Sequence, residues 1–381
     1  MNSSLKSNYL YCILVCSFLF AEDLVYEYNI SEGANLVSFP LISDNYNIEY
    51  FLSSSNTSLF SNYTINDKIK SLISEGELAF YDNGNWVGSL DEIDTKKGYW
   101  LISEEDFSFV LISNGNSENL YYMHPGSNLI SYPFNEEKPY YEAIPFLSDN
   151  LLAVLGENEA LLNNNGMLMG SLTHFKPGRG YWFIINDYAP FQFNESTLNS
   201  NNNYHIEPNL RDDEILNFNQ STLQTALFIE SIYISGNKNT ENINLEAICN
   251  NNIVGHSKWK NDFSDLIVMG DDGFAQTQDY CYENQNIIIR NSDTLDQFFN
   301  LSGSKQWSPN NFEVLILSDS NHGDLNFNQI INISDVVILI EHLMAYNIFE
   351  NEHQELLADL NKDDLINISD VVSIITQILE Q

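Results

Sequence analysis

Residues 23–200 alternate between apolar and polar side chains in short runs, and this period of two is typical of half-buried β-strands. The dipeptide Asn-Gly separates such runs at residues 83–84 and at residues 165–166. A tight type I′ turn needs positive φ at both of its central residues, which asparagine and glycine tolerate best. The pattern therefore predicts a β-hairpin at each place.

Three short signatures occur twice in this region and indicate an internal repeat. They are GANLVSFP at 33–40 with GSNLISYP at 126–133, Gly-Ser-Leu at 88–90 and 170–172, and Gly-Tyr-Trp at 98–100 and 180–182. The second and third signatures begin ten residues apart in both copies. We expect two small β modules, residues 22–114 and 115–198, and then an Asn-rich linker at 199–204.

Trp86, Trp100 and Trp182 could each stack on a sugar ring. Trp100 and Trp182, however, occupy the same place in the two copies, directly after Gly-Tyr. A position repeated in this way favours a role in the core of each module, so we expect Trp100 and Trp182 to be buried.

Residues 205–318 contain further short apolar runs separated by turns rich in Gly, Asn and Asp, which predicts a β-sandwich. Cys249 and Cys281 both lie here and are a candidate disulfide, but two separate buried thiols fit the sequence equally well, because spacing cannot place their Cβ atoms. Asp271 and Asp272 could contact a metal, although Gly-Asp-Asp-Gly more often forms only a turn.

The apolar period changes to helical spacing near the C-terminal end. Two stretches show it, and their apolar positions are Val336, Leu339, Ile340, Leu343 and Met344, then Val371, Ile374, Ile375, Ile378 and Leu379. Residues 314–317, by contrast, have the character of a strand. We therefore expect two amphipathic helices, with no helix directly before the first of the loops described next.

Each predicted helix follows a twelve-residue loop with oxygen-bearing side chains at positions 1, 3, 5, 9 and 12. A hard divalent cation takes about six to eight oxygen ligands, and a chain that turns once around it presents alternate side chains inward. The sequence at 331–337 is identical to that at 366–372, which places both loops in the same register. The candidate calcium ligands are Asp324, Asn326, Asn328, Asn332 and Asp335 in loop one, and Asp359, Asn361, Asp363, Asn367 and Asp370 in loop two.

The alternative is an Asn- and Asp-rich turn before a Ser-capped helix, which the occurrence of two such loops in register disfavours. Position 6 of a calcium loop is normally glycine because the chain turns there with positive φ, yet Gln329 and Asp364 occupy it here. Loop one offers two ligand carboxylates and loop two offers three. We therefore predict that the second site binds calcium more tightly.

Two loops, each followed by one helix and ending in Asp at position 12, resemble the type I dockerin over about residues 323–381, and we place the domain at residues 320–381. The resemblance implies a small all-α, calcium-binding domain that docks to a cohesin module of another protein. The recognition positions of this family fall on Ile333, Ser334, Ile368 and Ser369. The two β repeats resemble modules with the signatures Gly-Trp-Asn-Leu-Ile-Ser-x-Pro and Lys-Gly-Tyr-Trp from secreted bacterial surface proteins, although the first Trp is absent here.

The net charge of −38, from 53 acidic and 15 basic residues, argues against a nucleic-acid partner, whose phosphates need a basic face. Residues 1–21 have the features of a secretory signal peptide: Lys6, an apolar stretch from Tyr9 to Phe20, and Ala21. An uncleaved anchor is the alternative, which the short apolar core disfavours. We expect an extracellular or cell-surface protein with no membrane span after signal cleavage.

The sequence contains no His-x-x-x-His pair, no Gly-x-Ser-x-Gly elbow and no phosphate-binding Gly-rich loop. A glycosidase needs only two suitably spaced carboxylates, which sequence does not identify among so many acids. The favoured interpretation is a secreted, non-catalytic modular protein, mostly β, that docks through calcium-dependent helices. The alternatives are a polysaccharide-binding or polysaccharide-degrading extracellular protein, and a calcium-stabilised structural protein with no external partner.

Overall fold

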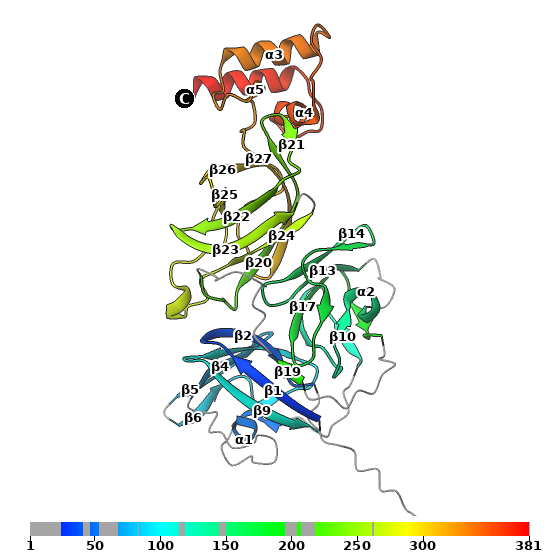
Figure 1. Ribbon diagram of the computed structural model, residues 1–381, viewed down its shortest axis with the longest axis vertical. Helices are drawn as coiled ribbons and strands as arrows, with labels where there is room; N and C mark the ends of the chain where they lie inside the picture. Colours follow the sequence, from blue (N-terminus) through cyan, green and yellow to red (C-terminus); the bar gives the residue numbers. More distant parts are fainter. Residues whose placement is uncertain are drawn as a thin grey trace, which may run out of the picture.

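The computed structural model describes residues 24–40, 46–52, 68–82, 84–113, 119–144, 150–194, 204–206, 218–260 and 263–380 (Figure 1). The predicted signal peptide and most of the predicted Asn-rich linker lie outside the described residues. The remainder is mostly β, with a helical region at one end of an elongated molecule, as the sequence pattern predicted (Figure 1).

The first repeat is built around a five-stranded sheet of order β2-β8-β4-β5-β6. Its elements are β1 (Leu24–Ile30), β2 (Gly33–Ser38), β3 (Tyr46–Asn47), α1 (Ile48–Leu52), β4 (Ile69–Ser74), β5 (Glu77–Asp82), β6 (Asn85–Gly88), β7 (Glu92–Ile93), β8 (Gly98–Ser103) and β9 (Phe107–Ser113). Strands β1 and β9 form an antiparallel pair beside this sheet.

The second predicted repeat has the corresponding sheet order, β11-β17-β13-β14-β15. Its elements are β10 (Tyr121–Met123), β11 (Gly126–Ser131), β12 (Lys138–Pro139), α2 (Tyr140–Ala143), β13 (Leu151–Leu155), β14 (Ala160–Asn164), β15 (Met167–Met169), β16 (His174–Phe175), β17 (Gly180–Ile185) and β18 (Ala189–Phe191). The Asn-Gly dipeptides lie between β5 and β6 and between β14 and β15, where hairpins were predicted.

The repeated Gly-Tyr-Trp signature lies where the five-stranded sheets of the two repeats pack closely together. A Cβ on Gly180 would lie 3.1 Å from the Cα of Gly98, so the backbones touch at this pair of glycines. The hydroxyls of Tyr99 and Tyr181 accept backbone hydrogen bonds inside their own modules. Trp100 and Trp182 are only 1% and 7% exposed and belong to one shared core, which confirms their predicted structural role.

The third module is a strongly curled sheet of order β21-β20-β27-β26-β25-β22-β23. Strand β24 also belongs to this sheet and pairs with β20. The elements of the module are β20 (Gln224–Ile234), β21 (Asn237–Lys238), β22 (Asn242–Cys249), β23 (Asn252–Lys260), β24 (Ser264–Met269), η1 (Ala275–Thr277), β25 (Ile288–Asn291), β26 (Gln297–Ser302) and β27 (Asn311–Ser318). The predicted sandwich is thus formed by one sheet that folds over its own core as a half-barrel. Strand β19 (Tyr204–Ile206), at the predicted start of this module, pairs in parallel with β1 of the first repeat.

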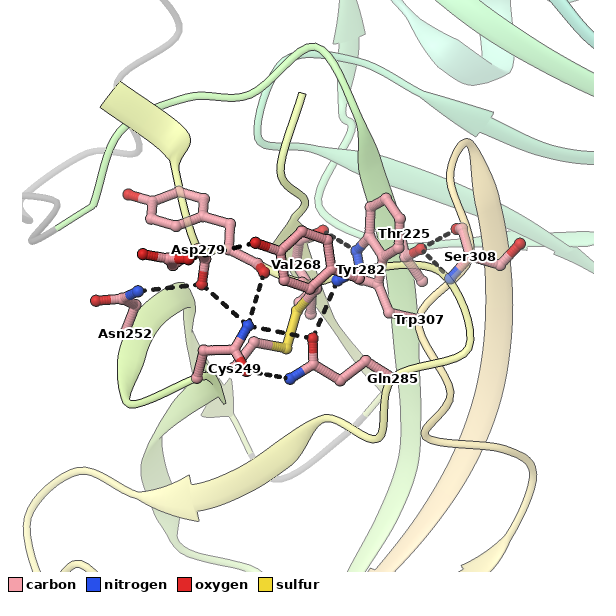
Figure 2. The surroundings of a disulfide bond; sticks show 12 residues. Thr225, Cys249, Asn252, Val268, Asp279, Tyr282, Gln285, Trp307 and Ser308 are labelled. Atoms are coloured by element: carbon pink, nitrogen blue, oxygen red, sulfur yellow. Dashed lines mark hydrogen bonds between the residues drawn. A yellow bond between two sulfur atoms is a disulfide. The ribbon is translucent and has the colours of Figure 1, made fainter. Parts of the chain in front are cut away.

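Cys249 and Cys281 are joined in a disulfide, with their Cα atoms 5.2 Å apart (Figure 2). This bond settles the alternative that the spacing had left open. Polar contacts order the surrounding loops: Asn252 Nδ2 donates to the carbonyl of Asp279 at 3.1 Å, and Trp307 Nε1 donates to the carbonyl of Val268 at 3.0 Å (Figure 2). The disulfide therefore ties the end of β22 to the loops that close the half-barrel.

The helical region consists of α3 (Ile333–Leu343), α4 (Glu352–Ala358) and α5 (Ile368–Leu379). Helices α3 and α5 are the two amphipathic helices that the apolar spacing predicted, and β27 confirms the strand before them. None of the helices in the described residues is long and apolar enough to cross a membrane.

Candidate calcium-binding and docking site

The first carboxylate of each loop accepts the same two backbone hydrogen bonds. Asp324 accepts from the N–H of Asn328 at 3.1 Å and of Gln329 at 2.8 Å. Asp359 accepts from the corresponding N–H groups of positions 5 and 6 at 3.2 and 2.9 Å. These bonds curl each loop around its first side chain and leave both carboxylates on the inside of the turn.

The last carboxylate of each loop closes the ring from the other side. Asp335 accepts from the backbone N–H of Leu325 at 3.0 Å and of Asn332 at 2.9 Å. Asp370 accepts from the N–H of Leu360 at 3.0 Å and of Asn367 at 2.9 Å. Asn332 and Asn367 also cap α3 and α5, so position 9 fixes the start of each helix.

Both loops adopt positive φ at position 6, although neither has glycine there. The φ angles are 63° at Gln329 and 61° at Asp364. Position 4 has the same conformation, with φ of 59° at Phe327 and 57° at Lys362. The substituted residues therefore accept the left-handed backbone that the calcium loop requires, at some conformational cost for a side chain with a Cβ.

Loop one fits a calcium ion in its chemistry. All five candidate side chains offer oxygen, which is the donor that calcium prefers. The Oδ1 atom of Asn326, at position 3, is buried and accepts no hydrogen bond. An unpaired buried acceptor costs free energy, and a bound cation would satisfy it.

Burial also raises the pKa of the Asp335 carboxyl above its ordinary value, and the charge of nearby Asp324 raises it further. Asp324 and Asp335 are both almost completely buried. Two desolvated carboxylates close together are stabilised by a positive charge between them. The electrostatics of loop one therefore favour a divalent cation.

Loop two is more open. Asn361 Nδ2 donates to Asp363 Oδ2 at 2.9 Å, and both side chains are exposed. Across the described stretches of the chain, no group of three or more His, Cys, Asp or Glu side chains is placed to hold a metal ion. The predicted tighter binding of calcium at the second site stays a prediction.

The predicted recognition residues are exposed at the first turns of α3 and α5. Ile333 is 66% exposed and Ile368 is 67% exposed, and Ser334 and Ser369 are exposed beside them. Further apolar residues continue each exposed stripe along its helix: Val337, Ile340 and Leu343 on α3, and Val372, Ile375 and Leu379 on α5. The opposite sides of both helices pack into one small core through Val336, Leu339, Val371 and Ile374.

Helix α4 was not predicted, although Asn351 caps it and Glu352 and Glu355 lie in its first turn, which is a helix-start signal. Helix α4 ends at Ala358, directly before Asp359, so the second loop lies between two helices. The expectation that each loop has a helix after it and none before it was therefore wrong for loop two. The α4 residue His353 is completely buried against the third β module.

The other candidate positions have structural roles. Asp271 accepts a hydrogen bond from the N–H of Gly273 at 2.9 Å, and Asp272 accepts from the N–H of Thr222 at 2.8 Å. Asp271 therefore orders its own turn, and Asp272 joins that turn to Thr222, fifty residues earlier in the chain. Trp86 is partly buried against Tyr81 on the first repeat.

Comparison with known protein families matches residues 322–379 to the dockerin type I domain. Neither the curated proteins nor the solved structures contain a match to the chain. Type I dockerins bind calcium and dock to cohesin modules, and the loop geometry described above is consistent with that match. Residues 322–379 are thus a type I dockerin domain carried on a body of three β modules.

Proposed function

We propose that this chain is a secreted, non-catalytic modular protein that attaches to a cohesin module through its calcium-ordered dockerin domain. The observation that carries this proposal is the pair of matching exposed stripes on α3 and α5, each beginning at position 10 of a calcium loop, in the first turn of its helix. Apolar stripes of this kind on a soluble domain favour a protein partner. The partner chemistry that fits is a mainly apolar cohesin surface with acceptors and donors for Ser334 and Ser369.

Calcium has a structural role in this proposal. The side chains of Asp324, Asn326, Asn328, Asn332 and Asp335 would hold one ion, and those of Asp359, Asn361, Asp363, Asn367 and Asp370 a second. The ion supplies positive charge that offsets the buried carboxylates and fixes the loops. We propose that the second site is the tighter one when the dockerin is considered by itself.

The near identity of the two helices supports a second element of the proposal, two binding orientations. Residues Ile333 and Ile368 differ by one percentage point in exposure, so either stripe could face the partner. Ser334→Arg and Ser369→Arg should each leave affinity for a cohesin almost unchanged, because the other stripe can replace the blocked one. The double variant should weaken binding at least about tenfold.

A panel of purified type I cohesins, titrated with the full chain by calorimetry in calcium, is the direct measurement. Loss of binding in either single variant would show that only one orientation is used. If the chain binds none of the cohesins in the presence of calcium, cohesin docking itself is contradicted. The extracellular location, within an assembly of the cellulosome type, is part of the same proposal and follows from the domain family and the signal-like residues 1–21.

A structural role is a second candidate, because α4 packs on the third β module rather than standing clear of it. The two roles are compatible. Removal of residues 320–381 should then lower the Tm of the remaining chain by several degrees, because Leu301 and Ile316 would lose their cover. An unchanged Tm would limit the domain to docking alone.

A further inference from the structure

The dockerin domain and the third β module share an interface centred on His353. The imidazole ring of His353 stacks on the ring of Tyr233 from β20, with centroids 5.0 Å apart. Its Nε2 atom lies 2.7 Å from the hydroxyl oxygen of Ser318 at the end of β27. The Tyr233 hydroxyl donates to Glu352 at 2.8 Å. Helix α4 is therefore fixed to the β module by polar and aromatic contacts together.

The other face of the same imidazole touches the first calcium loop. The ring of Phe327 stacks on His353 at 4.9 Å, so His353 lies between Phe327 and Tyr233. Gly236 lies against this ring from the turn between β20 and β21, where a Cβ would be only 2.9 Å from a Phe327 ring carbon. The β module thus holds a residue that lies inside loop one, between ligands Asn326 and Asn328.

The neighbouring parts of loop one face the same module. Gln354 Nε2, on α4, donates to the carbonyl of Leu325 at 3.0 Å, and Leu325 is buried in a core that includes Leu301 of β26. Beside these contacts is a cavity of about 710 Å³ between the two domains. Loop-one residues form one wall of it, and Phe298, Phe299 and Asp319 contribute to the other.

Loop two has a different residue at position 4, the position of Phe327 in loop one. The counterpart of Phe327 is Lys362, which is exposed. The internal duplication would make the two loops equivalent, but the β module supports one of them through an aromatic residue that the other does not have. Loop one is also the loop with fewer carboxylates and with Gln329 at position 6, so it has more to gain from outside support.

We propose that Tyr233 and His353 are positioning residues for the first calcium site, so that calcium binding at loop one and packing of the dockerin on the third β module stabilise each other. This rests on the proposed calcium-dependent function of the domain. A loop that is already held in its bound shape loses less conformational entropy when the ion binds. Because linkage is reciprocal, calcium must strengthen the packing by the same factor by which the packing strengthens calcium binding.

The experiment is a calcium titration of the full chain by isothermal titration calorimetry, in the wild type and in Tyr233→Ala. We expect the variant to bind calcium at one site with unchanged affinity and at the other about tenfold more weakly, which is within the usual range of coupling between sites. Tyr233→Phe keeps the ring and should bind like the wild type. Tyr282→Ala, which removes an exposed tyrosine of the same module, is the matched control.

His353→Ala tests the same contact from the dockerin side and leaves the core of the β module intact. It should weaken the same site to a similar degree, and the double variant with Tyr233→Ala should be no weaker than either single one, because both remove one shared stack. Circular dichroism in the β region checks that the module is folded in each variant.

Two calcium sites with wild-type affinities in both Tyr233→Ala and His353→Ala would overturn the coupling while leaving the calcium-binding function in place. Weakening of both sites to the same extent would also overturn it, because the proposed support reaches loop one only. Absence of calcium binding in the wild-type chain would instead contradict the proposed function itself, so the two failures are distinguishable.

Discussion

Glu157 and Arg179 form a buried ion pair in the second repeat, with Arg179 Nη1 2.6 Å from Glu157 Oε2. Burial raises the pKa of the Glu157 carboxyl, and the adjacent guanidinium opposes that rise. Glu157 also accepts from the backbone N–H of Leu36 in the first repeat at 3.3 Å, so the pair joins the two modules. The buried Glu157 carboxylate is therefore stable in its charged form only because Arg179 lies beside it.

Arg179→Met should lower the free energy of unfolding by about 3–5 kcal/mol at neutral pH, because it leaves a buried carboxylate without its partner. Urea denaturation followed by tryptophan fluorescence measures this. Glu75, the counterpart of Glu157 in the first repeat, contacts His124 at a partly exposed place, so His124→Met should cost less than about 1 kcal/mol. Equal costs in the two variants would show that burial does not set the strength of these contacts.

His353 gives a second prediction at this scale, on pH. Burial lowers the pKa of its imidazole from 6.5 to about 4. The Ser318 hydroxyl is oriented toward the carbonyl of Ser320, so Nε2–H donates to Ser318 and the buried Nδ1 has no partner. Protonation of Nδ1 would bury a charge, and the unfolded chain therefore binds a proton more readily than the folded one between about pH 6.5 and pH 4.

The stability that neutral His353 contributes should therefore be complete above about pH 6.5 and should disappear as the pH falls toward 4. The difference in Tm between the wild type and His353→Gln, measured in saturating calcium, should shrink across this window. A difference that stays constant from pH 7 to pH 4 would contradict a neutral buried imidazole.

Among the elements, the short helices of the dockerin domain depend most on their surroundings. Helices α3 and α5 have 11 and 12 residues, which is marginal for an isolated helix in water. Each begins at an Asn cap whose loop is closed by buried carboxylates, so the start of the helix and the ion site are one structure. Removal of the ion should leave the caps strained by unpaired negative charge.

Chelation of calcium in the full chain should therefore reduce the helical signal in circular dichroism and leave the β signal of the three modules almost unchanged. Asn367→Ala, which removes the cap of α5, should act in the same direction at fixed calcium and cost about 1 kcal/mol. A helical signal that is indifferent to chelator would exclude a calcium-ordered domain. Magnesium added in place of calcium is the control for ionic strength.

Sequence periodicity was most informative for these elements. The spacing of apolar residues located α3 and α5, and the Asn-Gly dipeptides located two hairpins, because both signals are local. Helix α4 was missed because only seven residues are helical and its stability comes from His353, whose burial is a tertiary property. The pairing of Cys249 with Cys281 was left open for a similar reason: two positions 32 residues apart meet only through the fold.

The repeats show the same limit. Ser89 and Ser171 are equivalent in sequence and both are exposed, yet Ser171 donates from its N–H and its hydroxyl to the two oxygens of Asp265 in the third module, at 2.8 and 2.6 Å. Phe80 is likewise exposed, and its counterpart Leu162 is buried. The third module covers only one of two similar surfaces, and no local pattern indicates which one.

At the scale of the whole molecule, one core connects all three β modules. Trp100 of the first repeat, Trp182 of the second and Trp259 of the third belong to the same buried cluster, whereas the dockerin residues form a different cluster together with Leu301 and Ile316 of the third module. The β modules should therefore unfold together although they are distinct in sequence. The five tryptophans lie at 86, 100, 182, 259 and 307, all outside the dockerin, so their fluorescence reports on the β body alone.

The disulfide offers a test of this shared core. The double variant Cys249→Ala, Cys281→Ala removes a cross-link between positions 32 residues apart in sequence. It should lower the free energy of unfolding by about 2–4 kcal/mol. Because the core is continuous, the double variant should shift a single fluorescence transition that includes Trp100 and Trp182 of the repeats, far from the cysteines in sequence. Two separate transitions, of which only one moves, would show instead that the modules unfold independently and that the contacts between Ser171 and Asp265 do not couple them.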